Sequence, residues 1–125
     1  MQLHEWMRHY LKRNASIKGW KVSCTSDHDC NVHTPHGERR YLAMEHIDLS
    51  SVESNSVIVA ANTEKNILSA IEDLDSLTAE NVRILFVNPT SDQFWTLNVD
   101  FVRKYSNPET VRAQLKHHVG DVPFV

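Results

Sequence analysis

The stretch that decides the fold runs from Val57 to Pro89 and holds two short apolar segments, "VIVAA" (57–61) and "VRILFVNP" (82–89). Neither segment alternates with polar residues, which predicts strands that are buried on both faces of a sheet. Between them, "NTEKNILSAIEDLDSLTAEN" (62–81) carries apolar residues at helical spacing, and Asn62 or Thr63 can cap this helix. A strand, a helix and a strand in this order predict a parallel pair joined by a right-handed crossover.

Upstream of this unit, apolar residues recur at i, i+3, i+4, i+7 and i+8 from Leu3 to Leu11, which predicts a helix with one buried face. The segment from Asn14 to Gly19 ends that helix, and "WKVSCT" (20–25) follows as a β-prone run. The polar segment "SDHDCNVHTPHGERR" (26–40) fits either an edge hairpin or an irregular loop. A further strand is expected over residues 39–48.

Downstream, "QFWTLNVDFV" (93–102) predicts one more strand, antiparallel to its predecessor if the turn between them is tight. A final helix is expected with Asn107 as its cap, Pro108 at its first position and Gly120 at its C-terminal cap. The chain is therefore predicted to be a single α/β domain over residues 1–125, with a mixed β-sheet flanked by helices in the order α-β-β-β-(β)-α-β-β-α.

The composition narrows the classes of function. The longest apolar run, from Val57 to Ala61, is far shorter than the ~20 residues that a membrane helix needs, so no membrane partner is expected. The N-terminal segment lacks an apolar signal core, which favours a cytoplasmic location. A net charge of −3 argues against strong binding of nucleic acid, although a local basic groove is compatible with it. Three glycines are too few for a glycine-rich phosphate loop or a dinucleotide fingerprint.

The predicted element order resembles the core of the PD-(D/E)XK nuclease superfamily, which includes Holliday-junction resolvases and restriction-endonuclease-like proteins. The resemblance covers Leu3 to Pro89 and rests on a leading amphipathic helix, three meandering strands, a crossover helix and another strand, with phrases such as "IKGWKV" (17–22) after the first helix. It implies a site in which an aspartate and a glutamate hold Mg²⁺ or Mn²⁺, and a lysine two residues past the glutamate helps to activate water. Hard cations prefer carboxylate oxygens, and a bound metal polarises phosphate and lowers the pKa of water.

Two alignments with this superfamily are open. In the first, Asp29 and Glu45 are the metal ligands and Ile47 stands where the lysine belongs; Lys65 is then the substitute cation, since some relatives of the superfamily place the lysine there. This alignment leaves residues 57–61 as an extra strand. An acidic residue on the first helix sometimes joins such a site, which makes Glu5 a further candidate.

In the second alignment, Asp48 ends the second strand and "VIVAAN" (57–62) is the third, so Ala60 and Asn62 stand where the glutamate and lysine belong. Neither can perform that chemistry. This alignment predicts a non-catalytic binding or assembly module, acting on a protein partner or as a homo-oligomer, whereas the first predicts a nuclease or another nucleic-acid-processing protein. A simpler interpretation of Glu45 is that it is solvated or paired with an arginine such as Arg40.

The segment 24–36 gathers two cysteines and three histidines that could hold a structural metal, zinc being the metal that thiolate and imidazole suit best. These residues are Cys24, His28, Cys30, His33 and His36. The alternative is an exposed polar loop in which the cysteines face the core as small apolar side chains. Two cysteines are too few for a disulfide scaffold, and in a cytosolic chain both thiols are expected to be reduced.

Overall fold

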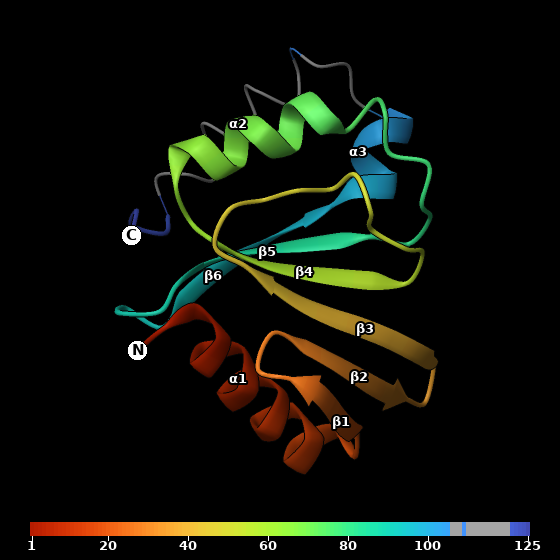
Figure 1. The fold of residues 1–125 in the computed structure, drawn as a ribbon, viewed down its shortest axis with the longest axis vertical. Coiled ribbons are helices and arrows are strands. Elements are labelled where there is room, and N and C mark those ends of the chain that lie inside the picture. Colours follow the sequence, from red (N-terminus) through yellow and green to blue (C-terminus); the bar gives the residue numbers. More distant parts are fainter. Residues whose placement is uncertain (106–108, 110–120) are drawn as a thin grey trace.

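A computed structural model describes residues 1–105, 109 and 121–125 of the chain. These residues form one six-stranded mixed sheet whose strands lie in their sequence order, with α1 on one face and α2 and α3 on the other (Figure 1). The elements are α1 Leu3–Lys18, β1 Lys21–Ser26, β2 Asp29–Thr34, β3 Gly37–Met44, β4 Ser56–Ala61, α2 Glu64–Asp73, β5 Arg83–Asn88, β6 Gln93–Asn98 and α3 Val99–Tyr105. The predicted fold class and element order are confirmed, including the additional strand before the second helix.

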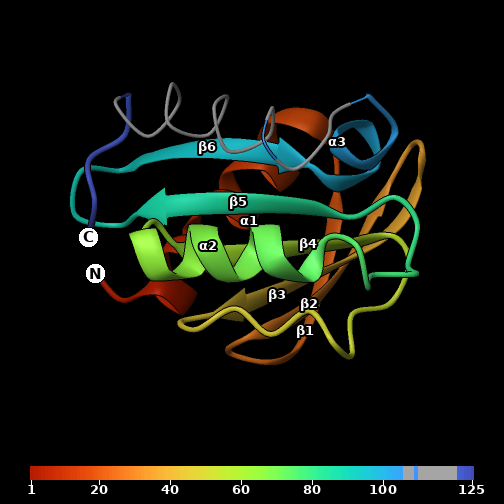
Figure 2. The same ribbon diagram turned by 90° about the horizontal axis from the view of Figure 1, so that it is seen from above.

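The neighbouring strands β4 and β5 are parallel and are covered on both faces. Every residue of β4 is buried, and in β5 only Arg83 is exposed. One set of their side chains packs with α2 (Figure 2), and the other packs with α1. The absence of polar alternation in these two segments is therefore explained by burial on both sides.

The predicted helix boundaries follow from local capping. Gly19 adopts a left-handed conformation (φ 70°), and its N–H donates to the Ala15 carbonyl at 3.0 Å, which ends α1. The Thr63 side chain accepts a hydrogen bond from the Asn66 N–H at 3.1 Å, so Thr63 is the cap of α2 and Asn62 is not. α2 ends at Asp73, earlier than the apolar pattern suggested.

Strands β1, β2 and β3 form an antiparallel meander, and β4 runs parallel to β3. The polar segment 26–40 is thus largely strand, with a tight turn that places Gly37 at φ 124°. The strand predicted over residues 39–48 begins at Gly37 and ends at Met44. The chain then crosses the α2 face of the sheet, where Leu49 and Val52 are buried, before it enters β4.

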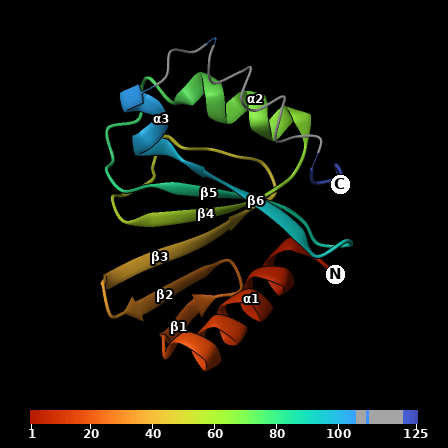
Figure 3. The ribbon, with the colours of Figure 1, turned by 180° about the vertical axis from the view of Figure 1, so that it is seen from behind.

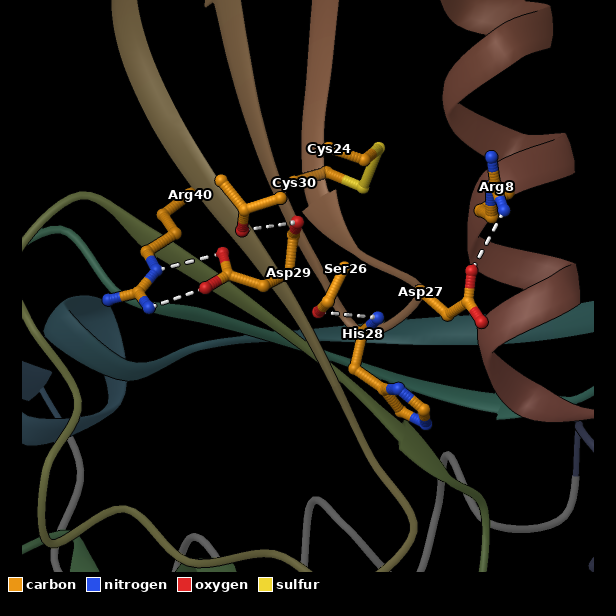
Figure 4. The surroundings of a disulfide bond; sticks show 9 residues. Arg8, Cys24, Ser26, Asp27, His28, Asp29, Cys30 and Arg40 are labelled. Carbon is orange, nitrogen blue, oxygen red and sulfur yellow. Dashed lines mark hydrogen bonds and ion pairs between the residues drawn. A yellow bond between two sulfur atoms is a disulfide. The ribbon is translucent and has the colours of Figure 1, made fainter.

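Cys24 and Cys30 lie directly opposite each other on β1 and β2 and form a disulfide bond (Figure 4). The expectation of reduced thiols is therefore wrong. The hairpin register brings the two residues together, and this register could not be inferred while the segment fitted both a hairpin and a loop.

The strand predicted over residues 93–102 is too long. β6 ends at Asn98, whose side-chain oxygen accepts a hydrogen bond from the Phe101 N–H at 3.2 Å, and α3 starts at Val99. The final helix expected between Asn107 and Gly120 lies outside the described residues. Within the described part of the chain, no helix is both long enough and apolar enough to cross a membrane.

The disulfide gives the first prediction. The bond joins cysteines six positions apart and keeps this loop closed in the unfolded chain. The lower entropy of the unfolded chain should stabilise the folded state by about 2 kcal/mol. A reductant should lower the free energy of urea unfolding of the wild type by this amount. It should leave the double variant Cys24→Ala, Cys30→Ala unchanged. Alkylation of both cysteines in the native, unreduced protein would contradict the assignment.

Candidate functional site

Asp29, the first proposed metal ligand, is held by an arginine of the same chain. Its two carboxylate oxygens accept hydrogen bonds from Nε and Nη2 of Arg40 at 3.0 and 2.6 Å (Figure 4). These hydrogen bonds lower the pKa of Asp29 below its ordinary value of 3.8. Arg40 also lies 3.6 Å from Glu53. A metal ion would have to displace Arg40 to use both oxygens of Asp29.

The other residues of the predicted metal site lie apart from Asp29 or point into solvent. Glu5 lines a hollow between α1 and β1 together with Cys24, whereas Asp29 lies on the opposite face of the sheet, across from Leu42. Glu45 follows β3 and is exposed, and Lys65 is exposed in the first turn of α2. In the described segments, no group of three or more His, Cys, Asp or Glu side chains could hold a metal ion.

Of the two simpler interpretations of Glu45, exposure to solvent is confirmed and pairing with Arg40 is not observed. Its side chain is exposed to solvent, but Arg40 pairs with Asp29 and Glu53 instead. The backbone carbonyl of Glu45 accepts a hydrogen bond from the Asn66 side chain at 2.8 Å, so the segment after β3 is fixed through its main chain.

The structure excludes the two cysteines of residues 24–36 as thiolate ligands of zinc. The disulfide removes both thiolates, because an oxidised cysteine is not a thiolate ligand. His28 packs its ring against His4 at 4.8 Å, and His33 contacts Glu38 at 3.0 Å. The prediction of a metal held by residues 24–36 through thiolate ligands is therefore wrong.

The carboxyl ends of β4 and β5 hold the C-terminal tail, residues 121–125. The Asn62 side-chain amide donates to two tail carbonyls at 3.1 and 3.2 Å, and the Asn88 amide donates to two at 3.0 and 3.3 Å. Trp95 Nε1 donates to Asn62 Oδ1 at 2.9 Å. Open α/β sheets usually bind ligands at this end of their strands. Asn62, which the second alignment places at the lysine position, instead anchors the tail.

A pocket of about 560 Å³ opens on the α1 face of the sheet, at the amino ends of β3 and β5. Seven of its described lining residues are cationic or aromatic groups or a histidine, and none is an aspartate or glutamate. We call it the basic aromatic pocket, defined by Lys18, Arg39 and Arg83 with Tyr10, Trp20 and Tyr41, and it also includes His36. It lies at the opposite end of the parallel strands from the predicted metal site.

The sheet register places two guanidinium groups around one phenol. Arg39 and Tyr41 share a face of β3, and Tyr41, Val57 and Arg83 are successive partners across β3, β4 and β5. Burial raises the pKa of Tyr41 to about 12, while the charges of Arg39 and Arg83 both oppose this shift. Burial also raises the pKa of Tyr10, again opposed by Arg83. Both guanidinium groups therefore lie within electrostatic reach of the Tyr41 hydroxyl.

The cations of this pocket lack carboxylate partners among the residues that the structure describes. The Lys18 ammonium lies 5.2 Å from the centre of the Trp20 ring, and Arg39 Nη1 is buried without a hydrogen-bond partner. In contrast, the other arginines of residues 1–105 each contact a carboxylate; they are Arg8, Arg13, Arg40 and Arg103. The positive charge of this pocket is therefore not compensated by a described carboxylate, which favours an anion as its ligand.

Sequence analysis did not identify the basic aromatic pocket, because its charges come from separate segments. Lys18 and Trp20 flank the end of α1, Arg39 belongs to β3 and Arg83 to β5. The available signal was the spacing of Arg39 and Tyr41, which puts both on one face of a strand. Only the sheet order shows that Arg83 lies beside them.

Comparison of the chain with known protein families, curated proteins and solved structures finds no significant match. The geometry of the described residues is therefore the basis for assigning a function.

The pairing of Asp29 with Arg40 gives the second prediction. Because the pKa of Asp29 is lowered in the folded state, its contribution to stability is present above pH 4 and is lost as the pH falls through the lowered value. Asp29→Asn should lower the free energy of unfolding at pH 7 by about 1 kcal/mol. The difference from wild type should shrink during titration to pH 2, measured by urea unfolding.

Asp75→Asn is the matched control, since Asp75 is exposed and forms no ion pair within the described segments. It should change stability little at any pH. An Asp29→Asn variant as stable as the wild type at pH 7 would show that Asp29 is not committed to Arg40 and is free for a metal.

Proposed function

We propose that the protein is a non-catalytic binding module that holds an anionic ligand in the basic aromatic pocket. The observation that carries this proposal is the pair of guanidinium groups, Arg39 and Arg83, which face one phenol and have no carboxylate partner in residues 1–105, 109 and 121–125. A guanidinium presents several N–H donors in a planar fork that matches the oxygens of a phosphate or carboxylate.

The proposal that no catalysis occurs draws support from the carboxylates. Asp29 is neutralised by Arg40, and Glu5 lies on the other face of the sheet. Metal-assisted phosphate chemistry needs carboxylates that converge on one ion. The resemblance to PD-(D/E)XK nucleases therefore stays a proposal about the ancestry of the fold. We propose that this chain has lost the catalytic residues of that superfamily.

We propose that the positive charges of the pocket itself attract the ligand, because the net charge of −3 gives the protein as a whole no attraction for polyanions. Binding to a protein partner, including a second copy of the chain, stays a prediction. The cytoplasmic location is also retained only as a proposal, and the Cys24–Cys30 disulfide weighs against it because disulfides persist mainly in oxidising compartments.

Nuclease activity supplies the third prediction. Wild-type protein incubated with Mg²⁺ or Mn²⁺ should not cleave supercoiled, linear or branched DNA, or RNA, as followed by gel electrophoresis. Cleavage that disappears in both Glu45→Ala and Asp29→Ala would contradict the proposal and favour the nuclease alternative. Cleavage that persists in both variants would come from another source and would leave that alternative without support.

Anion binding supplies the fourth prediction. Pyrophosphate at ten times its Kd should stabilise the protein by about 1.4 kcal/mol, which raises Tm by about 5 °C for a domain of this size. The shift should be lost in the double variant Arg39→Gln, Arg83→Gln, with each protein compared with its own ligand-free Tm. Lys65→Gln removes one positive charge on the other side of the sheet and should retain the full shift.

Poly-L-glutamate serves as a second anion in the same experiment, since carboxylates fit the guanidinium fork as phosphates do. If neither anion raises Tm, or if the double variant responds as strongly as the wild type, the proposed site is wrong.

A further inference from the structure

We propose that the ligand of the basic aromatic pocket is a mononucleotide, with its phosphate between Arg39 and Arg83 and its base against the aromatic side chains. This inference rests on the proposed binding function and adds the chemical class of the ligand. Three features of the pocket lead to it: the placement of the cations, the aromatic side chains and the volume.

The cations are placed to share one phosphate. Arg39 on β3 and Arg83 on β5 both line the pocket together with Tyr41, and the single strand β4 lies between them. Neighbouring strands lie about 4.8 Å apart and successive residues about 3.3 Å apart along a strand. Arg83 is level with Tyr41, two residues along β3 from Arg39, so the two arginine backbones are roughly 12 Å apart, a gap that two long side chains can close around one tetrahedral anion.

Three aromatic side chains line the pocket beside this charge, and of these Tyr10 and Trp20 are half-buried whereas Tyr41 is buried. The Tyr41 ring centre lies 6.4 Å from that of Tyr10 and 6.4 Å from that of Trp20. Stacking on such rings accepts any base, since every base has a π-face. Lys18, whose ammonium lies 5.2 Å from the centre of the Trp20 ring, adds a third cation to the lining of the pocket.

The volume of the pocket favours a nucleotide over a simple ion as the ligand. At about 560 Å³ the pocket falls within the range of ordinary small-molecule sites, roughly 300–1,000 Å³, and is much larger than one inorganic phosphate. A long nucleic-acid strand fits less well, because affinity for a polyanion grows with the number of phosphates neutralised and the chain has a net charge of −3.

The test is isothermal titration calorimetry of the full chain at fixed ionic strength. The ligands are AMP, GMP, CMP and UMP, with adenosine, inorganic phosphate and a ten-nucleotide single strand as comparisons. At least one mononucleotide should bind ten-fold or more tightly than both adenosine and inorganic phosphate. Arg83→Gln should weaken that binding at least ten-fold, and Lys65→Gln should leave it unchanged.

Trp20→Leu removes an aromatic ring and leaves the positive charges of the pocket unchanged, so it tests the two contributions separately. It should weaken mononucleotide binding several-fold without changing the affinity for inorganic phosphate, and Trp20→Phe should restore most of the loss. Circular dichroism and Tm establish that each variant is folded, and Arg83→Gln, at an exposed position, provides a readout even if the tryptophan variants do not fold.

Mononucleotides that bind no more tightly than inorganic phosphate would overturn this inference. A single strand that binds more than ten-fold more tightly than any mononucleotide would also overturn it, in favour of nucleic acid. In both cases, a pyrophosphate response that depends on Arg39 and Arg83 would leave the proposed function standing. Hydrolysis of the bound nucleotide, followed by chromatography, would instead contradict the non-catalytic function while retaining the ligand class.

Discussion

The parallel pair β4 and β5 is buried on both faces, and this burial organises the rest of the molecule. Packing from α1 on one side and α2 on the other excludes polar residues from both strands, apart from those at their ends. The helices therefore lie in separate layers on either side of the sheet (Figure 3). The polar residues of these two strands therefore lie at the strand ends.

The two ends differ in what fills them. At the carboxyl ends, Asn62 and Asn88 bind the backbone of the tail, so the chain itself satisfies these buried amides. At the amino ends, Arg39 and Arg83 line a pocket with the buried Tyr41 and the half-buried Tyr10, and no described carboxylate pairs with either arginine. The other described arginines each contact a carboxylate, and this contrast is why we propose that the amino ends hold an external anion.

The sequence predicts those parts of the fold that depend on local pattern. Uninterrupted apolar runs identified β4 and β5, helical spacing identified α1 and α2, and Gly19 marked a helix end because its left-handed backbone suits a residue without a side chain. Two features that were wrong or missed, the disulfide and the partner of Asp29, depend on the register between strands. Cys24 meets Cys30, and Asp29 meets Arg40, only because the hairpins align them.

The candidate site was harder to predict than the fold for the same reason. Asp29, Glu45 and Lys65 were selected by residue type and by order along the chain, and neither property specifies which side of a sheet a residue occupies. The basic aromatic pocket combines the end of a helix with two strands that are not adjacent. Its charges form a cluster only in three dimensions. Along the sequence, the spacing of Arg39 and Tyr41 looks like that of many exposed strand ends.

Chemical-shift mapping tests most directly whether binding occurs at the amino ends of the parallel strands. Nitrogen-15-labelled protein would be titrated with pyrophosphate. The account predicts the largest changes at the Trp20 indole N–H and at the amides of Arg39, Tyr41 and Arg83. Changes centred on the amides of Asp29, Glu45 and Lys65, with the Trp20 signal unmoved, would contradict it.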